Sequence, residues 1–331
     1  MKLFYDYDLK YPDLMISILE YFWLEGDFNS KTVIDFCTHN KYNVGSNYLQ
    51  PQIILKICDI LMDNNILSQI RRGGALGGDT SYSFVWRDSK DNWQLEKDLY
   101  NHICCSLVYG FNYIYRHYQD KVIPIVAFQN NGKQSMGSSF KFYNGIVTAR
   151  HCIADGDLFS IKGYTSSQLE TAKVYVSKNP AIDIAYIETG EKSEVYVDTP
   201  QILDNILVMG YPKIPMFLDF LTAEKASIST IAKWRMTPTN GAITAIAPNM
   251  YTYKDTDLIL ITARIKGGNS GGPIINNRGC VVGVAFSEPL SEGEGYDDLG
   301  YGVGMPIQML DNIISEKNII SPKFKSWTEE S

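Results

Sequence analysis

The sequence lacks the features of an exported, membrane-spanning or nucleic-acid-coating protein. No uncharged apolar run approaches the ~18 residues of a membrane span, and the N-terminus, MKLFYDYDLKYPDLM, has no apolar core of the signal-peptide kind. Basic residues are in deficit: the net charge is −7, and neither half of the chain has the basic excess of a non-specific nucleic-acid binder. We therefore expect a cytoplasmic protein that has no membrane partner.

Cysteine and histidine are also scarce. The 331 residues contain six cysteines and four histidines, and no CxxC pair. Cysteines this sparse do not form a disulfide framework in a chain of this length. His102 stands beside Cys104 and Cys105, but that segment has a helical pattern without a second pair of ligands, so we interpret the residues as buried thiols and predict no metal site.

Apolar residues make up 45% and charged residues 20% of the chain, an ordinary globular mixture that excludes disorder, and the length suggests about two domains. The first part has three helical patterns followed by two strand-like runs. They are the segments from Pro12 to Gly26, from Ser30 to Cys37, from Pro51 to Asn65, from Ile66 to Arg72 and from Tyr82 to Trp86. This order resembles a winged-helix domain, so we predict a regulatory or docking domain of that kind over residues 1–90.

The pattern of apolar residues changes near the middle of the chain, from helical spacing to short β-rich runs. Apolar residues at mostly four-residue spacing between Trp93 and His117 predict one long amphipathic linker helix over residues 91–120. Beyond Lys121 the sequence consists of short β-rich runs separated by turn signals, which is typical of an all-β sandwich or barrel over residues 121–320. A closing helix is expected over 305–317, and residues 321–331 are predicted to be a C-terminal tail.

Three short segments of the second half contain candidate catalytic residues. GIVTARHC places His151 at the end of a strand, IDIAYI places Asp183 among apolar residues, and GGNSGGP places Ser270 in a glycine-rich turn. A serine hydroxyl becomes a nucleophile when an imidazole accepts its proton, and the imidazole needs a carboxylate on its other nitrogen. The glycines allow the backbone N–H groups near Ser270 to converge on one point.

TARHC, DIA and GNSGGP, in this order, resemble the trypsin/chymotrypsin-like serine proteases. VMGYP at 208–212 and GYGVGMPI at 300–307 are similar to the HtrA-like branch of that family. The resemblance implies a multidomain chain in which an α+β winged-helix-like domain and a linker helix precede a double β-barrel. It also implies a triad of His151, Asp183 and Ser270, an oxyanion hole at Gly268, Asn269 and Ser270, and no cofactor.

The sequence departs from digestive members of the family in two places. Cys152 follows the histidine as it does there, but Met136 stands where we expect its disulfide partner. Asn269 replaces the aspartate that binds a newly cleaved N-terminus, so activation by that route is not expected. HtrA-like proteins usually carry a PDZ domain after the barrel, and the residues beyond Ile319 are too few for one.

The resemblance also implies a specificity pocket formed by Arg264, Phe286, Ser287, Glu288 and Gly302. If the Arg264 guanidinium points inward, it favours an acidic side chain before the scissile bond, which is the preference we predict. Two alternatives stay open: an outward Arg264 leaves a site for small apolar residues, and the acidic loop SEGEGYDD attracts basic ones.

We therefore predict a serine endopeptidase that acts on protein substrates and is regulated or targeted by its N-terminal domain, which has a possible protein partner. The alternative is a winged-helix DNA-binding regulator or scaffold whose protease-like domain is inactive. DNA is not favoured, because the third helical segment offers only Lys56 and the hairpin only Arg71 and Arg72 as basic side chains.

Overall fold

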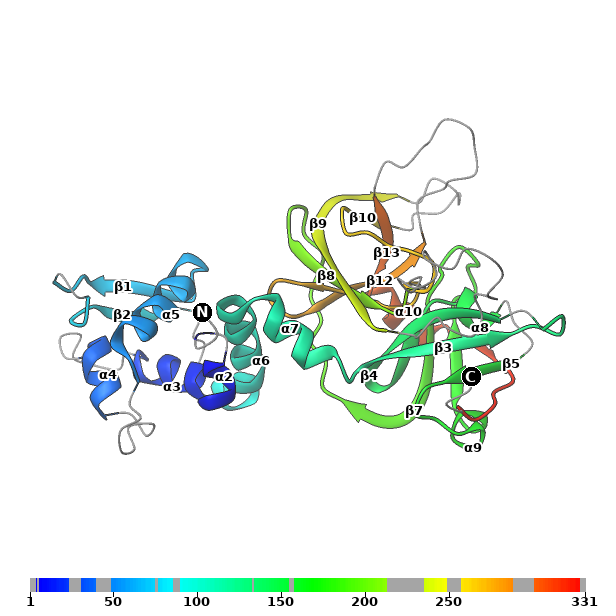
Figure 1. Cartoon of the computed structure of the whole chain (residues 1–331), viewed down its shortest axis with the longest axis horizontal. Coiled ribbons are helices and arrows are strands. Elements are labelled where there is room, and N and C mark those ends of the chain that lie inside the picture. The colour runs from blue at the N-terminus through cyan, green and yellow to red at the C-terminus, as the bar shows by residue number, and fades with distance from the viewer. Residues whose placement is uncertain are drawn as a thin grey trace, which may run out of the picture. The chain divides into compact units, whose positions relative to one another are not determined.

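The computed structural model divides into two compact units, Met1–Ile114 and Tyr115–Ser331 (Figure 1). Within the part of the chain that the model describes, no helix is both long enough and apolar enough to cross a membrane. The described residues are 4, 6–23, 31–39, 49–74, 77–85, 90–132, 134–154, 158–212, 235–248, 257–287 and 301–327.

In the described residues of the first unit, a helix of four residues precedes the three predicted helices, and an antiparallel hairpin follows them as expected. The third of these helices, α5, begins after the extended residue Gln50 with Pro51 in its first turn, and it ends where Asn65 takes a left-handed φ of 59°. The elements are α2 (Tyr7–Lys10), α3 (Leu14–Tyr21), α4 (Val33–His39), α5 (Pro51–Asp63), β1 (Leu67–Arg71), β2 (Ser81–Phe84) and α6 (Lys90–Tyr109).

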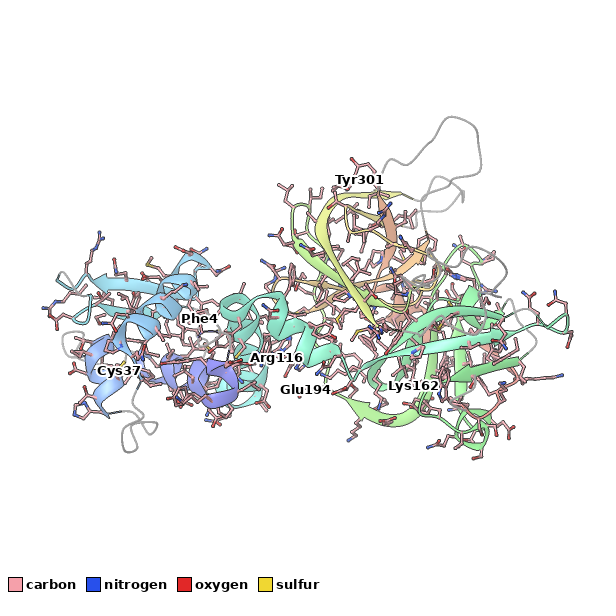
Figure 2. The ribbon with its side chains drawn as sticks, in the orientation of Figure 1. Phe4, Cys37, Arg116, Lys162, Glu194 and Tyr301 are labelled. Carbon is pink, nitrogen blue, oxygen red and sulfur yellow. The ribbon has the colours of Figure 1, made fainter. Side chains whose placement is uncertain are left out.

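Helix α6 packs into the core of the first unit through an aromatic cluster. Trp93 of α6 lies edge-on against Trp23 and Phe84, with ring centroids 5.3 and 5.5 Å apart. Such contacts contribute beyond the burial of area alone. The thiols predicted to be buried are buried and form no disulfide among the described residues of either unit, and Figure 2 labels Cys37 among the helices of the first unit.

The segment predicted to be one linker helix is instead two helices. Gly110, with a φ of 66°, separates α6 from α7 (Phe111–Tyr118). Its N–H donates to the Ser106 carbonyl, and its own carbonyl accepts from the N–H of Tyr113. The apolar spacing continues across this glycine, which is why the periodicity alone predicts an unbroken helix; the left-handed conformation ends it.

The described residues of the second unit form two β-sheets of six strands each. One is a closed barrel in the order β10-β13-β12-β11-β8-β9, and the other is a sheet in the order β14-β6-β7-β4-β3-β5. The helix predicted over 305–317 is shorter, because Met305 and Pro306 end a strand. The elements are β3 (Val122–Phe128), β4 (Gln134–Thr148), α8 (His151–Ala154), β5 (Leu158–Ile161), α9 (Ser166–Glu170), β6 (Lys173–Val176), β7 (Ala185–Ser193), β8 (Asn205–Gly210), β9 (Thr237–Pro248), β10 (Asp257–Ile261), β11 (Pro273–Asn276), β12 (Val281–Ser287), β13 (Gly302–Pro306), α10 (Met309–Ser315) and β14 (Ile319–Ile320).

Residues 319–325, which include the first part of the predicted C-terminal tail, pair with the second of these sheets. After β14 pairs with β6, Phe324 forms a parallel bridge to Phe159 at the other edge, on β5. The N–H of Phe159 donates to the Lys323 carbonyl and the N–H of Lys325 donates to the Phe159 carbonyl. Phe324 is buried in the core of the same sheet. The segment therefore joins the two edges, and its apolar side chains hold it there.

Candidate active site

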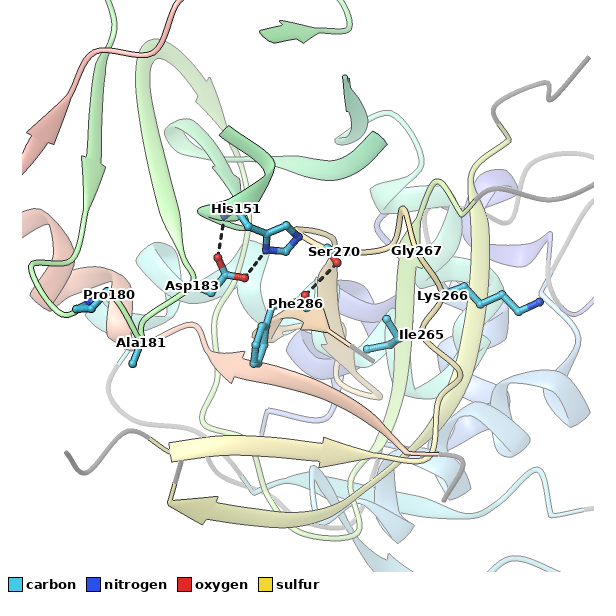
Figure 3. Close-up of a pocket in the computed structure, with 9 residues that line it drawn as sticks. All are labelled: His151, Pro180, Ala181, Asp183, Ile265, Lys266, Gly267, Ser270 and Phe286. Carbon is cyan, nitrogen blue, oxygen red and sulfur yellow. Dashed lines mark hydrogen bonds and ion pairs between the residues drawn. The ribbon is translucent and has the colours of Figure 1, made fainter. Parts of the chain in front are cut away.

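His151 and Asp183 form a carboxylate–imidazole pair. His151 is the first residue of α8, directly after β4, and Asp183 precedes β7, the strand that pairs with β4. One carboxylate oxygen of Asp183 lies 2.6 Å from Nδ1 of His151, and the other accepts the backbone N–H of His151 at 2.8 Å (Figure 3). The pair fixes the orientation of the ring and leaves Nε2 as the nitrogen that can accept a proton.

The surroundings of His151 change its basicity. Partial burial of the ring favours the neutral imidazole, but the hydrogen bond to Asp183, with further contributions from Cys152, outweighs it and raises the pKa of His151 above its ordinary value. The carboxylate therefore stabilises the imidazolium that forms when a proton arrives at Nε2. The His151 side chain is 39% exposed, so the ring is open to the cavity beside it.

Ser270 lines the same cavity as His151. Its hydroxyl donates to the Phe286 carbonyl at 3.0 Å, and within the described residues it makes no hydrogen bond to Nε2 of His151, which instead lies 3.6 Å from Sγ of Cys152. Nucleophile–base hydrogen bonds of ligand-free sites are often absent and tighten when substrate binds.

The turn before Ser270 presents two unpaired backbone N–H groups. Its closing hydrogen bond runs from the N–H of Asn269 to the Lys266 carbonyl at 2.9 Å. Gly268 has a φ of 103°, as the third residue of a type II turn requires, and a β-carbon there would lie 2.4 Å from the Tyr211 carbonyl oxygen. Among the residues that the model describes, the N–H groups of Gly268 and Ser270 have no acceptor. Two such donors are what an oxyanion requires.

The third residue of the predicted oxyanion turn, Asn269, faces the interior. It is 2% exposed, and its Oδ1 atom has no hydrogen-bond partner in the described part of the chain. Its backbone shapes the turn, because its N–H closes the turn and its carbonyl accepts the N–H of Gly272.

Ile265, rather than Arg264, faces the cavity. Ala263 and Ile265 are buried whereas Arg264 and Lys266 are exposed, so side chains alternate along this segment and Arg264 lies on the outer side. The inward Arg264 predicted from sequence is therefore not what the structure has. The cavity has a volume of about 620 Å³ and is lined by His151, Pro180, Ala181, Asp183, Ile265, Lys266, Gly267, Ser270 and Phe286.

Of the other residues predicted to form the specificity pocket, Phe286 lines the cavity. Gly302, buried in β13, lies behind Ile265, since a β-carbon on this glycine would be 2.7 Å from the Ile265 side chain. The backbone of Ser287 pairs with Val303 of β13. Glu288 and the acidic loop after it lie outside the described residues.

Gly137, and not Met136, faces Cys152. A β-carbon on Gly137 would lie 2.3 Å from Sγ of Cys152. Met136 pairs with Val126 in the neighbouring register position of β3 and β4. Successive side chains of a strand point to opposite faces, so an error of one residue in the register replaces Gly137 by Met136, the residue predicted from sequence.

Replacing Gly137 by Cys is expected to create a disulfide with Cys152 under oxidising conditions. The two β-carbons would be 3.2 Å apart, somewhat closer than the ~3.8 Å typical of disulfides, so the strand must move by a few tenths of an ångström. Closing a loop of about 15 residues stabilises by up to about 3 kcal/mol, less the strain. Mass spectrometry and thermal unfolding of the oxidised and reduced protein measure both effects. Met136→Cys is the control that should stay reduced, and cross-linking of that variant alone would contradict the register.

The comparisons with known proteins address the second unit. The family model described as "Trypsin-like peptidase domain" matches residues 137–284, a span that contains His151, Asp183 and Ser270. Protease Do-like 2, chloroplastic, of Arabidopsis thaliana is 29% identical over 177 residues, which are 50% of this chain and 26% of that protein. The chain thus spans about a quarter of the length of this relative.

Solved structures also align with part of the chain. The active form of the Rv3671c protease from M. tuberculosis is 20% identical and has a TM-score of 0.45, over 63% of this chain and 86% of that chain. A serine endoprotease from Yersinia pestis is 18% identical and has a TM-score of 0.43, over 63% of this chain and 66% of that chain.

Proposed function

We propose that the chain is a serine endopeptidase whose catalytic triad is Ser270, His151 and Asp183. The observation that carries the proposal is the pairing of both Asp183 oxygens with His151, beside a serine that lines the same cavity and follows a turn with two unpaired N–H groups. These are the groups that acyl transfer to serine requires.

In the proposed reaction, Oγ of Ser270 attacks the carbonyl carbon of a peptide bond while Nε2 of His151 takes the hydroxyl proton. The carbonyl oxygen becomes an oxyanion, and the N–H groups of Gly268 and Ser270 stabilise its charge. His151 then gives the proton to the leaving amine, and the C–N bond breaks to leave an acyl-enzyme. Asp183 holds the ring and stabilises its protonated form throughout.

Hydrolysis of the acyl-enzyme uses the same groups, with a water molecule as the nucleophile and Ser270 as the leaving group. His151 takes a proton from a water molecule, the hydroxide attacks the acyl carbon, and the second tetrahedral intermediate releases Ser270 with the proton returned from His151. Side chains and backbone N–H groups supply every step, so the proposal requires no metal or cofactor.

The lining of the cavity supports a preference for apolar side chains before the scissile bond. Ile265 and Phe286 lie next to Ser270, and Ala181 adds a small apolar surface (Figure 3). Arg264, on which the predicted acidic preference depended, is exposed on the outer side. Lys266 also lines the cavity, but its side chain extends away from Ser270 (Figure 3). The wall beside the nucleophile is therefore apolar, and the desolvation cost of a carboxylate there disfavours acidic substrates.

Arg264→Ala is accordingly expected to leave the substrate preference unchanged. Peptide libraries that vary only the residue before the scissile bond, with Asp/Glu, Lys/Arg or Ala/Val sets, should show the Ala/Val set cleaved fastest by both proteins, with kcat/KM of the variant within about twofold of the parent. An acidic preference that disappears in Arg264→Ala is the opposite result and would restore the inward arginine.

The first unit is proposed to be a winged-helix-like domain that docks a protein partner and regulates or targets the peptidase in the cytoplasm. The order of helices before a hairpin supports this likeness. On α5, Lys56 is exposed together with Gln52 and Asp63, a mixed surface with little positive charge. Since DNA binding requires clustered basic side chains, this surface favours a protein partner over DNA.

A fluorophosphonate probe tests the proposed function directly. The probe forms a covalent bond with activated serines, and we expect labelling of the full chain at Ser270, mapped by mass spectrometry of the modified peptide. Labelling should disappear in Ser270→Ala and persist in Ser135→Ala, a substitution at an exposed serine of β4. DNA retardation without labelling would support the alternative of a regulator with an inactive protease-like domain.

A further inference from the structure

One residue outside the triad contacts the oxyanion turn from behind. Ser138 lies on β4, the strand that precedes His151 in the chain, whereas the turn at 266–269 lies between β10 and β11 of the closed barrel. The Oγ atom of Ser138 is 2.6 Å from the Gly268 carbonyl oxygen, and its backbone N–H donates to the Ser270 carbonyl at 2.7 Å. The same residue therefore holds the carbonyls of both residues whose N–H groups face the oxyanion.

The direction of these hydrogen bonds is unambiguous. The N–H of Tyr211 lies 2.8 Å from Oγ of Ser138 and can only donate. The hydroxyl must therefore accept from Tyr211 and donate its single proton to the Gly268 carbonyl. The Ser138 carbonyl in turn accepts from the hydroxyl of Thr148 at 2.8 Å, so both ends of the residue are held.

The space around this hydroxyl is closed. Ser138 is completely buried, and a β-carbon on Gly210 would lie 2.8 Å from its Oγ and 2.7 Å from Oδ1 of Asn269. If the hydroxyl is removed, the Gly268 carbonyl and the Tyr211 N–H are left buried without this partner. The peptide between Gly268 and Asn269, whose carbonyl Ser138 holds and whose N–H closes the turn, then keeps only the closing hydrogen bond, so the adjoining Gly267–Gly268 peptide is held less firmly.

The orientation of the central peptide of the turn, Gly267–Gly268, decides whether the N–H group of Gly268 is available to the oxyanion. Type I and type II turns share the same closing hydrogen bond but differ by about 180° in the orientation of the central peptide, here Gly267–Gly268. With Gly268 at a φ of 103°, the turn has the type II form and the Gly268 N–H is unpaired. In the other form, a carbonyl oxygen replaces this N–H.

We propose that Ser138 is a positioning residue that keeps the oxyanion turn in its donor-presenting form by holding the Gly268 carbonyl from the neighbouring sheet. The inference rests on the proposed function, because it assigns Ser138 a role in the same site. Ser138 does not touch the reacting atoms. It acts through the turn, so its effect is on the transition state and not on ground-state binding of the substrate.

The kinetic test compares Ser138→Ala with Ser139→Ala. Ser139 is an equally buried neighbour on the same strand, but its hydroxyl donates to the Ile123 carbonyl at 3.0 Å, away from the turn. Loss of a complete oxyanion donor lowers kcat about 10²- to 10³-fold, so we expect Ser138→Ala to lower kcat by about 10- to 100-fold at a KM within about twofold. Ser139→Ala should change kcat by less than about threefold.

A second variant and a second measurement separate positioning from general destabilisation. Ser138→Cys keeps the shape but donates weakly, so its kcat should lie between those of the parent and Ser138→Ala. Hydrogen exchange by mass spectrometry follows the bonded N–H groups of the turn, those of Asn269, Gly271 and Gly272. Exchange in this peptide should accelerate at least several-fold in Ser138→Ala and stay unchanged in Ser139→Ala.

The outcomes distinguish the inference from the proposed function. Equal kcat and equal exchange in Ser138→Ala and Ser139→Ala would overturn the inference, as would a fall in kcat that Ser139→Ala matches. If the parent protein neither binds the fluorophosphonate nor cleaves peptides, the proposed function fails, and the exchange comparison still decides whether Ser138 holds the turn.

Discussion

Ser270→Ala is expected to reduce peptide hydrolysis by about a millionfold, to the level left by binding and the oxyanion donors alone. The alanine has no hydroxyl to attack the carbonyl. The measurement is kcat/KM on a peptide selected from the library experiment, with Ser135→Ala carried through the same purification as the control.

The fold should survive this substitution. The Ser270 hydroxyl makes a single hydrogen bond, to the Phe286 carbonyl, so the free energy of unfolding should fall by about 1 kcal/mol. Urea unfolding of Ser270→Ala and of the parent measures this difference. Residual hydrolysis above a thousandth of the parent rate by a correctly folded variant would contradict the assignment of Ser270 as nucleophile.

Asp183→Asn is expected to lower kcat by about 10⁴-fold with a smaller change in KM. The asparagine amide can donate to Nδ1 of His151, which places the ring proton on Nε2 and blocks acceptance of the serine proton. The control is Glu188→Gln on β7, which removes a carboxylate that pairs with Lys173 on the sheet surface. A loss of kcat in the control as large as in Asp183→Asn would show that net charge, and not the pairing with His151, determines activity.

The pH dependence gives the same residue a second test. His151 must be neutral to act as a base, so kcat/KM rises with pH as its imidazolium loses a proton. Burial opposes the charge, but the hydrogen bond to Asp183 dominates and raises the pKa of His151, so the rising limb should lie above the ordinary histidine range. In Asp183→Asn this support is lost and the limb should move to lower pH. A limb at the same pH in both proteins would contradict the role of Asp183.

The local sequence predicted much of the secondary structure because its signals are short-range. Pro51 and Asn64 mark the ends of α5, and the apolar runs beyond Lys121 predicted the strands of the second unit. Gly268 and Gly271 both take positive φ values, as the glycine-rich motif around Ser270 suggested. In each case the residue type restricts its own backbone conformation, so no distant partner is needed.

The sequence by itself determined which residue types are present for nucleophilic chemistry and the turn that holds Ser270. The tertiary structure alone decided which side chains meet. It placed Ile265 and not Arg264 at the cavity, Gly137 and not Met136 against Cys152, and Ser138 behind the turn. The physical reason is register: one residue along a strand reverses the direction of a side chain, and register is set by packing between segments that are distant in the chain.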